Sequence, residues 1–202
     1  MLSVAVIVLS ALMAAPVSAG EAVTECDRLA SNPEDPDRVA PGVERKDVDL
    51  QAAIAACEAE VARQPSNTRP RYQLARVLFY ARQNERAVRE MRAAADAGNR
   101  QAQFVYGALI SNRREHAPTD MCLVEQYWLK SARAGRQAAR VSYVRHALKG
   151  RFAGCRIQAS KDEMAQLLSR AKADAHDYYE RLLIEDLTEQ IASSGASSSP
   201  VQ

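Results

Sequence analysis

The stretch AVREMRAAADAGNRQAQFVYGALI, residues 87–110, carries the strongest structural signal in the sequence. Apolar and small side chains recur at helical spacing on both sides of Gly98, which stands where a left-handed helix cap favours glycine. Ala94 and Gly107 are small residues at positions where two closely packed helices approach each other. The stretch therefore predicts two short amphipathic helices joined as a hairpin.

The hairpin is repeated along the chain. Residues 128–135, WLKSARAG, repeat residues 91–98, MRAAADAG, and weaker copies precede and follow them at similar spacing. Helical hairpins repeated in this way stack into a solenoid, because no hairpin can bury both of its apolar faces alone. Only 5% of residues are aromatic, and runs of strand type are almost absent. We predict an all-α, right-handed α-solenoid of about four helical hairpins over residues 47–192.

Both ends of the chain have a different composition. Residues 1–19 combine an apolar run, Pro16 and a small-residue Val17-Ser18-Ala19 site, which predicts a secretory signal peptide. The run is shorter than the roughly 20 apolar residues that a membrane span needs. We expect cleavage and a periplasmic or secreted protein with no stable membrane span, and retention as an anchor is the open alternative. Residues 193–202, SSGASSSPVQ, predict a disordered tail.

Four cysteines follow the predicted cleavage site, and an even number in an exported chain favours disulfides. Three pairings are possible. We favour the most local one, Cys26–Cys57 with Cys122–Cys155, because the loops that carry Cys122 and Cys155 occupy equivalent positions in adjacent repeats. The first bridge would fasten residues 20–46, an acidic segment that contains three prolines, to the first repeat helix.

The repeated motif can be written A-x-x-x-W-x-x-x-A-x-x-G-x-x-x-A-x-x-x-[LY]-G, and it resembles the Sel1-like repeat, a relative of the tetratricopeptide repeat. The resemblance covers roughly residues 50–185. Two central copies match best, through Ala87, Ala94, Ala95, Gly98, Ala102, Tyr106 and Gly107 in one and through Val124, Tyr127, Trp128, Lys130, Ala132 and Gly135 in the other. The loops after Ile110 and Leu148 lack the family's usual G-x-G, so loop geometry is not carried over.

The resemblance implies a binding surface. In tetratricopeptide-like stacks, the first helix of each repeat lines a concave groove, which here would contain Arg69, Tyr72, Arg76, Tyr80, Gln101, Asn112, Arg145 and Lys149. Residues 63–156 carry 19 basic and 6 acidic side chains, whereas both flanks are acidic. Two interpretations are open: the basic face engages an acidic surface of a protein partner, or an anionic polymer or lipid, or else the acidic flanks fold back and neutralise it. An exported chain is not expected to bind nucleic acid.

Catalytic motifs are missing from the sequence. It contains no G-x-S-x-G, no phosphate-binding glycine loop and no H-E-x-x-H, and we predict no catalytic, cofactor-binding or metal-binding residues. The resemblance implies a non-catalytic protein–protein interaction or scaffold module of the bacterial envelope, for example one that regulates a membrane sensor or supports envelope assembly. The alternative is a secreted, disulfide-bonded repeat protein that hydrolyses a β-lactam or a cell-wall fragment.

Overall fold

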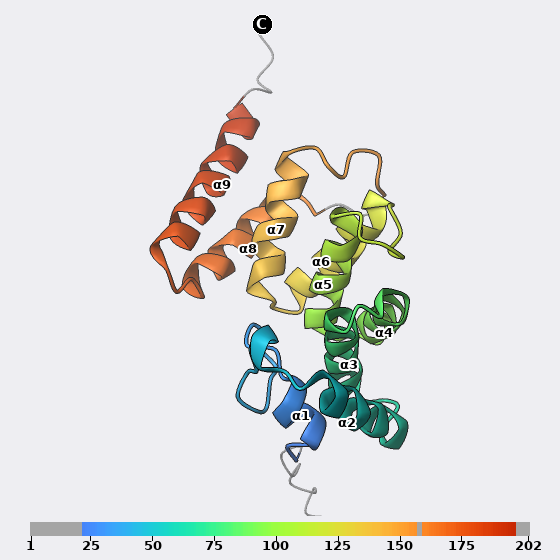
Figure 1. The fold of residues 1–202 in the computed structure, drawn as a ribbon. Coiled ribbons are helices and arrows are strands. Elements are labelled where there is room, and N and C mark those ends of the chain that lie inside the picture. The colour runs from blue at the N-terminus through green and yellow to red at the C-terminus, as the bar shows by residue number, and fades with distance from the viewer. Residues whose placement is uncertain (1–21, 157–158, 197–202) are drawn as a thin grey trace, which may run out of the picture.

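The computed structural model describes residues 22–156 and 159–196 (Figure 1). Regular structure in these ranges is entirely helical, with one 3-10 helix, η1, and nine α-helices: α1 Glu25–Ala30, η1 Arg45–Asp47, α2 Leu50–Arg63, α3 Thr68–Tyr80, α4 Asn84–Asp96, α5 Arg100–Ser111, α6 Met121–Arg133, α7 Gln137–Leu148, α8 Lys161–Ala173 and α9 Tyr178–Ala196. The predicted signal peptide, residues 1–19, lies outside the described residues. Helix α9 continues through Ala196, so the predicted tail boundary at residue 193 is too early, and residues 197–202 lie outside the description.

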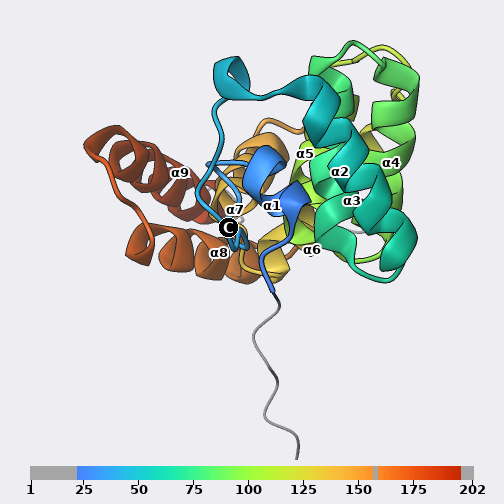
Figure 2. The same ribbon diagram turned by 60° about the horizontal axis from the view of Figure 1, so that its bottom comes forward.

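Helices α2 to α9 form four consecutive pairs, and each helix packs against the next one in the chain. Helix α1 and the irregular segment after it do not extend this row. They lie between the end of the stack formed by α2–α4 and the end formed by α8 and α9 (Figures 1 and 2). The predicted row of about four helical hairpins is confirmed, and the N-terminal segment is an additional layer on it.

The two central hairpins turn in the same way. Gly98 and Gly135 have φ angles of +94° and +93°, the left-handed region in which glycine is not strained. At each site the glycine amide donates to the carbonyl three residues earlier, and the next amide donates to the carbonyl five residues earlier. These bonds satisfy carbonyls that the helix end would otherwise leave without a partner. The predicted equivalence of the two segments is therefore confirmed.

The two central helical pairs pack closely because the large ring of Trp128 lies against Gly107, which has no side chain. The indole of Trp128 lies over Gly107, and its Nε1 donates to the carbonyl of Phe104 at 2.9 Å. Tyr106 and Tyr143 are buried in the same core. A second, smaller core lies under α1 and contains the first disulfide.

Both disulfides have the predicted local connectivity. Cys26 on α1 is bonded to Cys57 on α2, with their Cα atoms 4.6 Å apart. Cys122 at the start of α6 is bonded to Cys155 in the segment after α7, with a Cα separation of 5.3 Å. The first bridge ties the N-terminal segment to the stack, and the second ties the start of α6 to the segment after α7.

Replacing Gly107 by alanine tests the close approach of α5 and α6. A Cβ at this position would overlap the Nε1 and Cδ1 atoms of Trp128, so we expect Gly107→Ala to lower the free energy of unfolding by about 1–3 kcal/mol. Urea denaturation followed by circular dichroism measures the change. A second substitution, Trp128→Leu in the Gly107→Ala background, should cost less than Trp128→Leu alone. Additive losses would contradict the proposed overlap.

Candidate functional site

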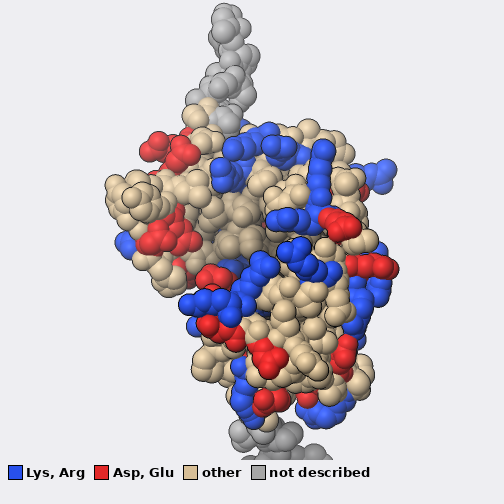
Figure 3. All heavy atoms as spheres, in the orientation of Figure 1, with Lys and Arg blue, Asp and Glu red and all other residues tan. Residues whose placement is uncertain are grey.

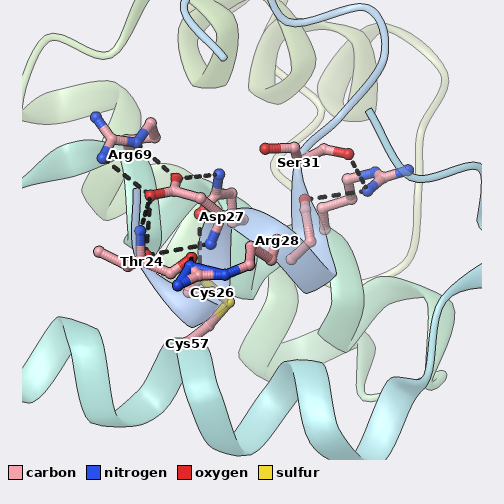
Figure 4. Close-up of a disulfide and its surroundings, with 10 residues drawn as sticks. Thr24, Cys26, Asp27, Arg28, Ser31, Cys57 and Arg69 are labelled. Carbon is pink, nitrogen blue, oxygen red and sulfur yellow. Dashed lines mark hydrogen bonds and ion pairs between the residues drawn. A yellow bond between two sulfur atoms is a disulfide. The ribbon is translucent and has the colours of Figure 1, made fainter. Parts of the chain in front are cut away.

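The N-terminal segment is held on the stack by a buried carboxylate. Asp27, whose side chain is fully buried, accepts hydrogen bonds from Arg69 Nε at 2.8 Å and Arg69 NH2 at 3.1 Å (Figure 4). It also accepts from Gln73 Nε2 and from the backbone and hydroxyl of Thr24, each at 2.9 Å. Burial by itself would raise the pKa of Asp27, but the bonds from Arg69, Thr24 and Gln73 lower it below its ordinary value.

Arg76 binds the backbone of the same segment. Its NH1 group donates to the carbonyls of Ala30 and Ser31, both at 3.1 Å, and its NH2 group donates to the carbonyl of Val43 at 2.6 Å. The first of these acceptors belongs to the last turn of α1, where carbonyls lack partners within the helix. A single guanidinium on α3 therefore fixes both the start and the end of the connection between α1 and η1.

Further polar contacts connect the N-terminal segment, α3 and α5. The hydroxyl of Tyr72 accepts from Asn32 Nδ2 at 2.5 Å and from Gln101 Nε2 at 3.4 Å. Burial raises the pKa of Tyr72 to about 12, so its hydroxyl stays protonated. Nearer the surface, Arg100 on α5 binds both carboxylate oxygens of Asp37, at 2.6 and 2.5 Å.

These contacts correct the predicted groove. Four of its eight residues are buried beneath the N-terminal segment: Arg69, Tyr72, Arg76 and Gln101. Their polar groups bind acids, amides and carbonyls of this same chain and are therefore not free for a partner. Tyr80 is half-buried, and Asn112, Arg145 and Lys149 are exposed. The eight residues therefore do not form one open surface.

The charge imbalance along the sequence is partly neutralised within the fold. Basic residues of the central helices pair with acids of both flanks, in the pairs Arg69–Asp27, Arg86–Glu58, Arg100–Asp37, Arg133–Glu163 and Arg140–Asp174. Of the two interpretations of the charge pattern, the folding back of the acidic flanks is thus observed for these residues.

One group of basic residues is left without such partners. We define the basic edge as the exposed residues Arg113, Arg114, Arg145, Lys149, Arg151 and Arg156. They lie in or beside the segments after α5 and α7, which the Cys122–Cys155 disulfide joins. No ion pair with a carboxylate is found for any of the six in the described part of the chain. Basic side chains gather over this upper end of the molecule in Figure 3.

Sequence reasoning found only two members of the basic edge, Arg145 and Lys149. The signal for the others was the basic character of the loops after Ile110 and Leu148, which stand side by side once adjacent repeats are stacked. Those loops carry no helical period, so the groove argument, which rested on helix faces, passed over them.

His146 follows Arg145 on α7 and adds no charge to the basic edge. Its ring packs edge-on against Trp128 at 4.7 Å between centroids, and its Nδ1 lies 2.9 Å from the carbonyl of Ser142. Burial lowers the pKa of His146, and the nearby cations Arg151, Arg145 and Lys149 lower it further. The imidazole is therefore neutral at pH 7, and the positive charge of the edge comes from arginine and lysine alone.

The one buried acid of α6 has no access to a substrate. Glu125 is fully buried and accepts a hydrogen bond from the hydroxyl of Tyr143 at 3.0 Å, and the same hydroxyl accepts from the backbone of Ala159 at 2.8 Å. Burial raises the pKa of Glu125. Its other oxygen, Oε2, is buried and has no hydrogen-bond partner among the described residues. This carboxyl links α6, α7 and the start of α8.

The described residues contain neither a cluster of metal-ligating side chains nor a membrane-spanning helix. Within residues 22–156 and 159–196, no group of three or more His, Cys, Asp or Glu side chains is placed to hold a metal ion. Nor does any helix in those ranges combine the length and the apolar composition that a membrane crossing needs.

The arrangement of helical pairs is similar to a solved structure. A Sel1 repeat protein from Oxalobacter formigenes superposes on this chain with a TM-score of 0.51 at 19% sequence identity, covering 68% of this chain and 96% of the other. The chain has the Sel1-repeat fold. No protein-family model and no curated protein matches the sequence. The Sel1-repeat stack thus provides the scaffold, while the N-terminal segment and the basic edge are described from this chain's own residues.

Replacing Asp27 by asparagine tests the buried ion pair. The change leaves Arg69 buried without a counter-charge, so we expect the free energy of unfolding to fall by about 3–5 kcal/mol. Asp37→Asn removes an exposed pair and should cost no more than about 1 kcal/mol. Because the native pKa of Asp27 is lowered, the advantage of the native protein over Asp27→Asn should shrink as the pH falls below 3.8, the ordinary value. Equal losses for both variants would contradict the assignment.

Glu125 and Glu163 should titrate with opposite effects on stability. The raised pKa of Glu125 means that ionisation destabilises the native state, so Glu125→Gln should gain stability relative to the native protein as the pH rises from 4 to 8. Glu163, whose pKa is lowered by its hydrogen bond with Arg133, should do the reverse: Glu163→Gln loses relative stability over the same range. Urea unfolding at several pH values measures both trends, and parallel trends would refute the interpretation.

Proposed function

We propose that the protein is a non-catalytic binding module of the bacterial envelope, and that its basic edge engages an acidic surface of a partner protein. The Sel1-repeat fold supplies a rigid stack of helical pairs on which such a surface is displayed. Regulation of a membrane sensor and support of envelope assembly are the roles that this proposal favours.

The observation that carries the proposal is the clustering of the basic edge. Acidic residues from both flanks pair with Arg69, Arg100, Arg133 and other basic side chains, yet none of the described carboxylates forms an ion pair with the six cations of this edge. Clustered unpaired charge of one sign raises the association rate with a surface of opposite sign and disfavours wrong partners.

The compartment is inferred from the two disulfides. Both cysteine pairs are bonded, and no cysteine in the described residues is left free. Stable disulfides of this kind form in the periplasm or outside the cell rather than in the cytosol. This compartment agrees with the secretory signal peptide predicted at residues 1–19.

Charge reversal at the basic edge tests the proposed function. Residues 20–202 carrying Arg145→Glu, Lys149→Glu and Arg151→Glu should bind partners from an envelope extract about tenfold more weakly than the native protein. Affinity capture with quantitative mass spectrometry measures the loss, and raising the salt concentration should weaken the native capture in the same way.

The matched control carries the same change of net charge elsewhere. Arg89→Glu, Arg92→Glu and Arg170→Glu alter exposed residues of α4 and α8 and should leave capture unchanged. Circular dichroism confirms that both triple variants are folded. Equal loss in the two variants, or full capture by the edge variant, would contradict a binding role for the basic edge.

A further inference from the structure

A cavity of about 210 Å³ lies between α3, α4 and α5, beside the start of the irregular N-terminal segment. Six of its lining residues are apolar: Ala75, Phe79, Ala87, Met91, Val105 and Leu109. Phe79, Val105 and Leu109 are only partly buried, so the space opens to solvent on that side. Apolar cavities of about 150 Å³ in other proteins stay dry and admit benzene. The volume and lining here suit one ring or one short hydrocarbon chain.

The mouth of the cavity is basic. Tyr80 lines it, and the guanidinium groups of Arg45 and Arg76 each lie 5.0 Å from the centre of the Tyr80 ring. Arg76 is already occupied by three backbone carbonyls and by the Tyr80 hydroxyl, to which its Nε donates at 3.0 Å. Arg45 is exposed, and its guanidinium contacts the Tyr80 ring.

The donors at this mouth point to one sign of ligand charge. Because the Tyr80 oxygen accepts from Arg76, its own proton is available to donate outward. Arg45, which is exposed and lies over the same ring, offers further N–H donors. Of the nine described residues that line the cavity, none is acidic. A carboxylate would therefore find charge-assisted hydrogen bonds at the rim, whereas an ammonium group would not.

We propose that this cavity binds a small monocarboxylic acid, with its apolar ring or short chain between α3, α4 and α5 and its carboxylate at Arg45 and Tyr80. The site is separate from the basic edge, because none of its lining residues belongs to that edge. The N-terminal segment contributes Asn32 to the lining and Arg45 over the Tyr80 ring, so the ligand couples that segment to the stack.

Three ligands that differ only in the polar group test the proposal: 4-phenylbutyrate, 4-phenylbutanol and 4-phenylbutylamine. Two-dimensional NMR of the methyl groups of Met91, Val105 and Leu109 reports binding. At low salt the acid should bind about tenfold more tightly than the alcohol, and the amine should bind more weakly than either. Absence of shifts with the acid at millimolar concentration, or equal affinity for all three ligands, would overturn the proposal.

Substitutions test the apolar cavity and the carboxylate position separately. Val105→Trp fills the cavity and should abolish binding of the acid, and Leu109→Phe serves as a milder filling variant should the first fail to fold. Arg45→Gln should reduce affinity for the acid to that for the alcohol, whereas Lys46→Gln, the same change at the next residue, should have no effect. Reversal of Arg145, Lys149 and Arg151 should also leave acid binding intact. Binding unaffected by folded filling variants would place the ligand elsewhere and refute the site.

Discussion

The ion pair between Asp27 and Arg69 sets the condition under which α1 and α3 can pack together. Both side chains are almost entirely removed from water, and either charge without the other would cost several kcal/mol. With the pair formed, the carboxylate is also saturated by Gln73 and Thr24. The acidic N-terminal segment and the basic α3 face therefore form one buried layer, and the Cys26–Cys57 bridge ties α1 to the adjacent helix α2.

That layer covers part of the surface of the helical stack. A solenoid of helical pairs would leave the polar residues of α3 and α5 open to solvent, but here Arg76 binds carbonyls of the segment and Tyr72 binds Asn32. The acids that neutralise the basic centre come from its own flanks. In the segments after α5 and α7, by contrast, the described residues show no ion pair between a flank acid and a basic side chain of the edge.

The stack itself is organised by close contacts between small and large residues. Gly107 admits the indole of Trp128, and the glycines at 98 and 135 turn each hairpin in the same left-handed way. Equivalent turns place the segments after α5 and α7 on the same edge, where the Cys122–Cys155 disulfide joins them. The basic edge is thus a consequence of repeat geometry, although no single repeat contains it.

Helical period, glycine caps and repeat register are properties of the sequence pattern, and for this reason the helices, the hairpins and the cysteine pairing could be predicted from the sequence. The position of residues 31–44 could not, because a segment with three prolines has no period to show which surface it covers. Its contacts join residues far apart in the chain, such as Val43 with Arg76 and Asp37 with Arg100. Only the tertiary structure determined that four predicted groove residues are buried and that six cations with no ion pair among the described residues share an edge, since both facts depend on which distant charges come together.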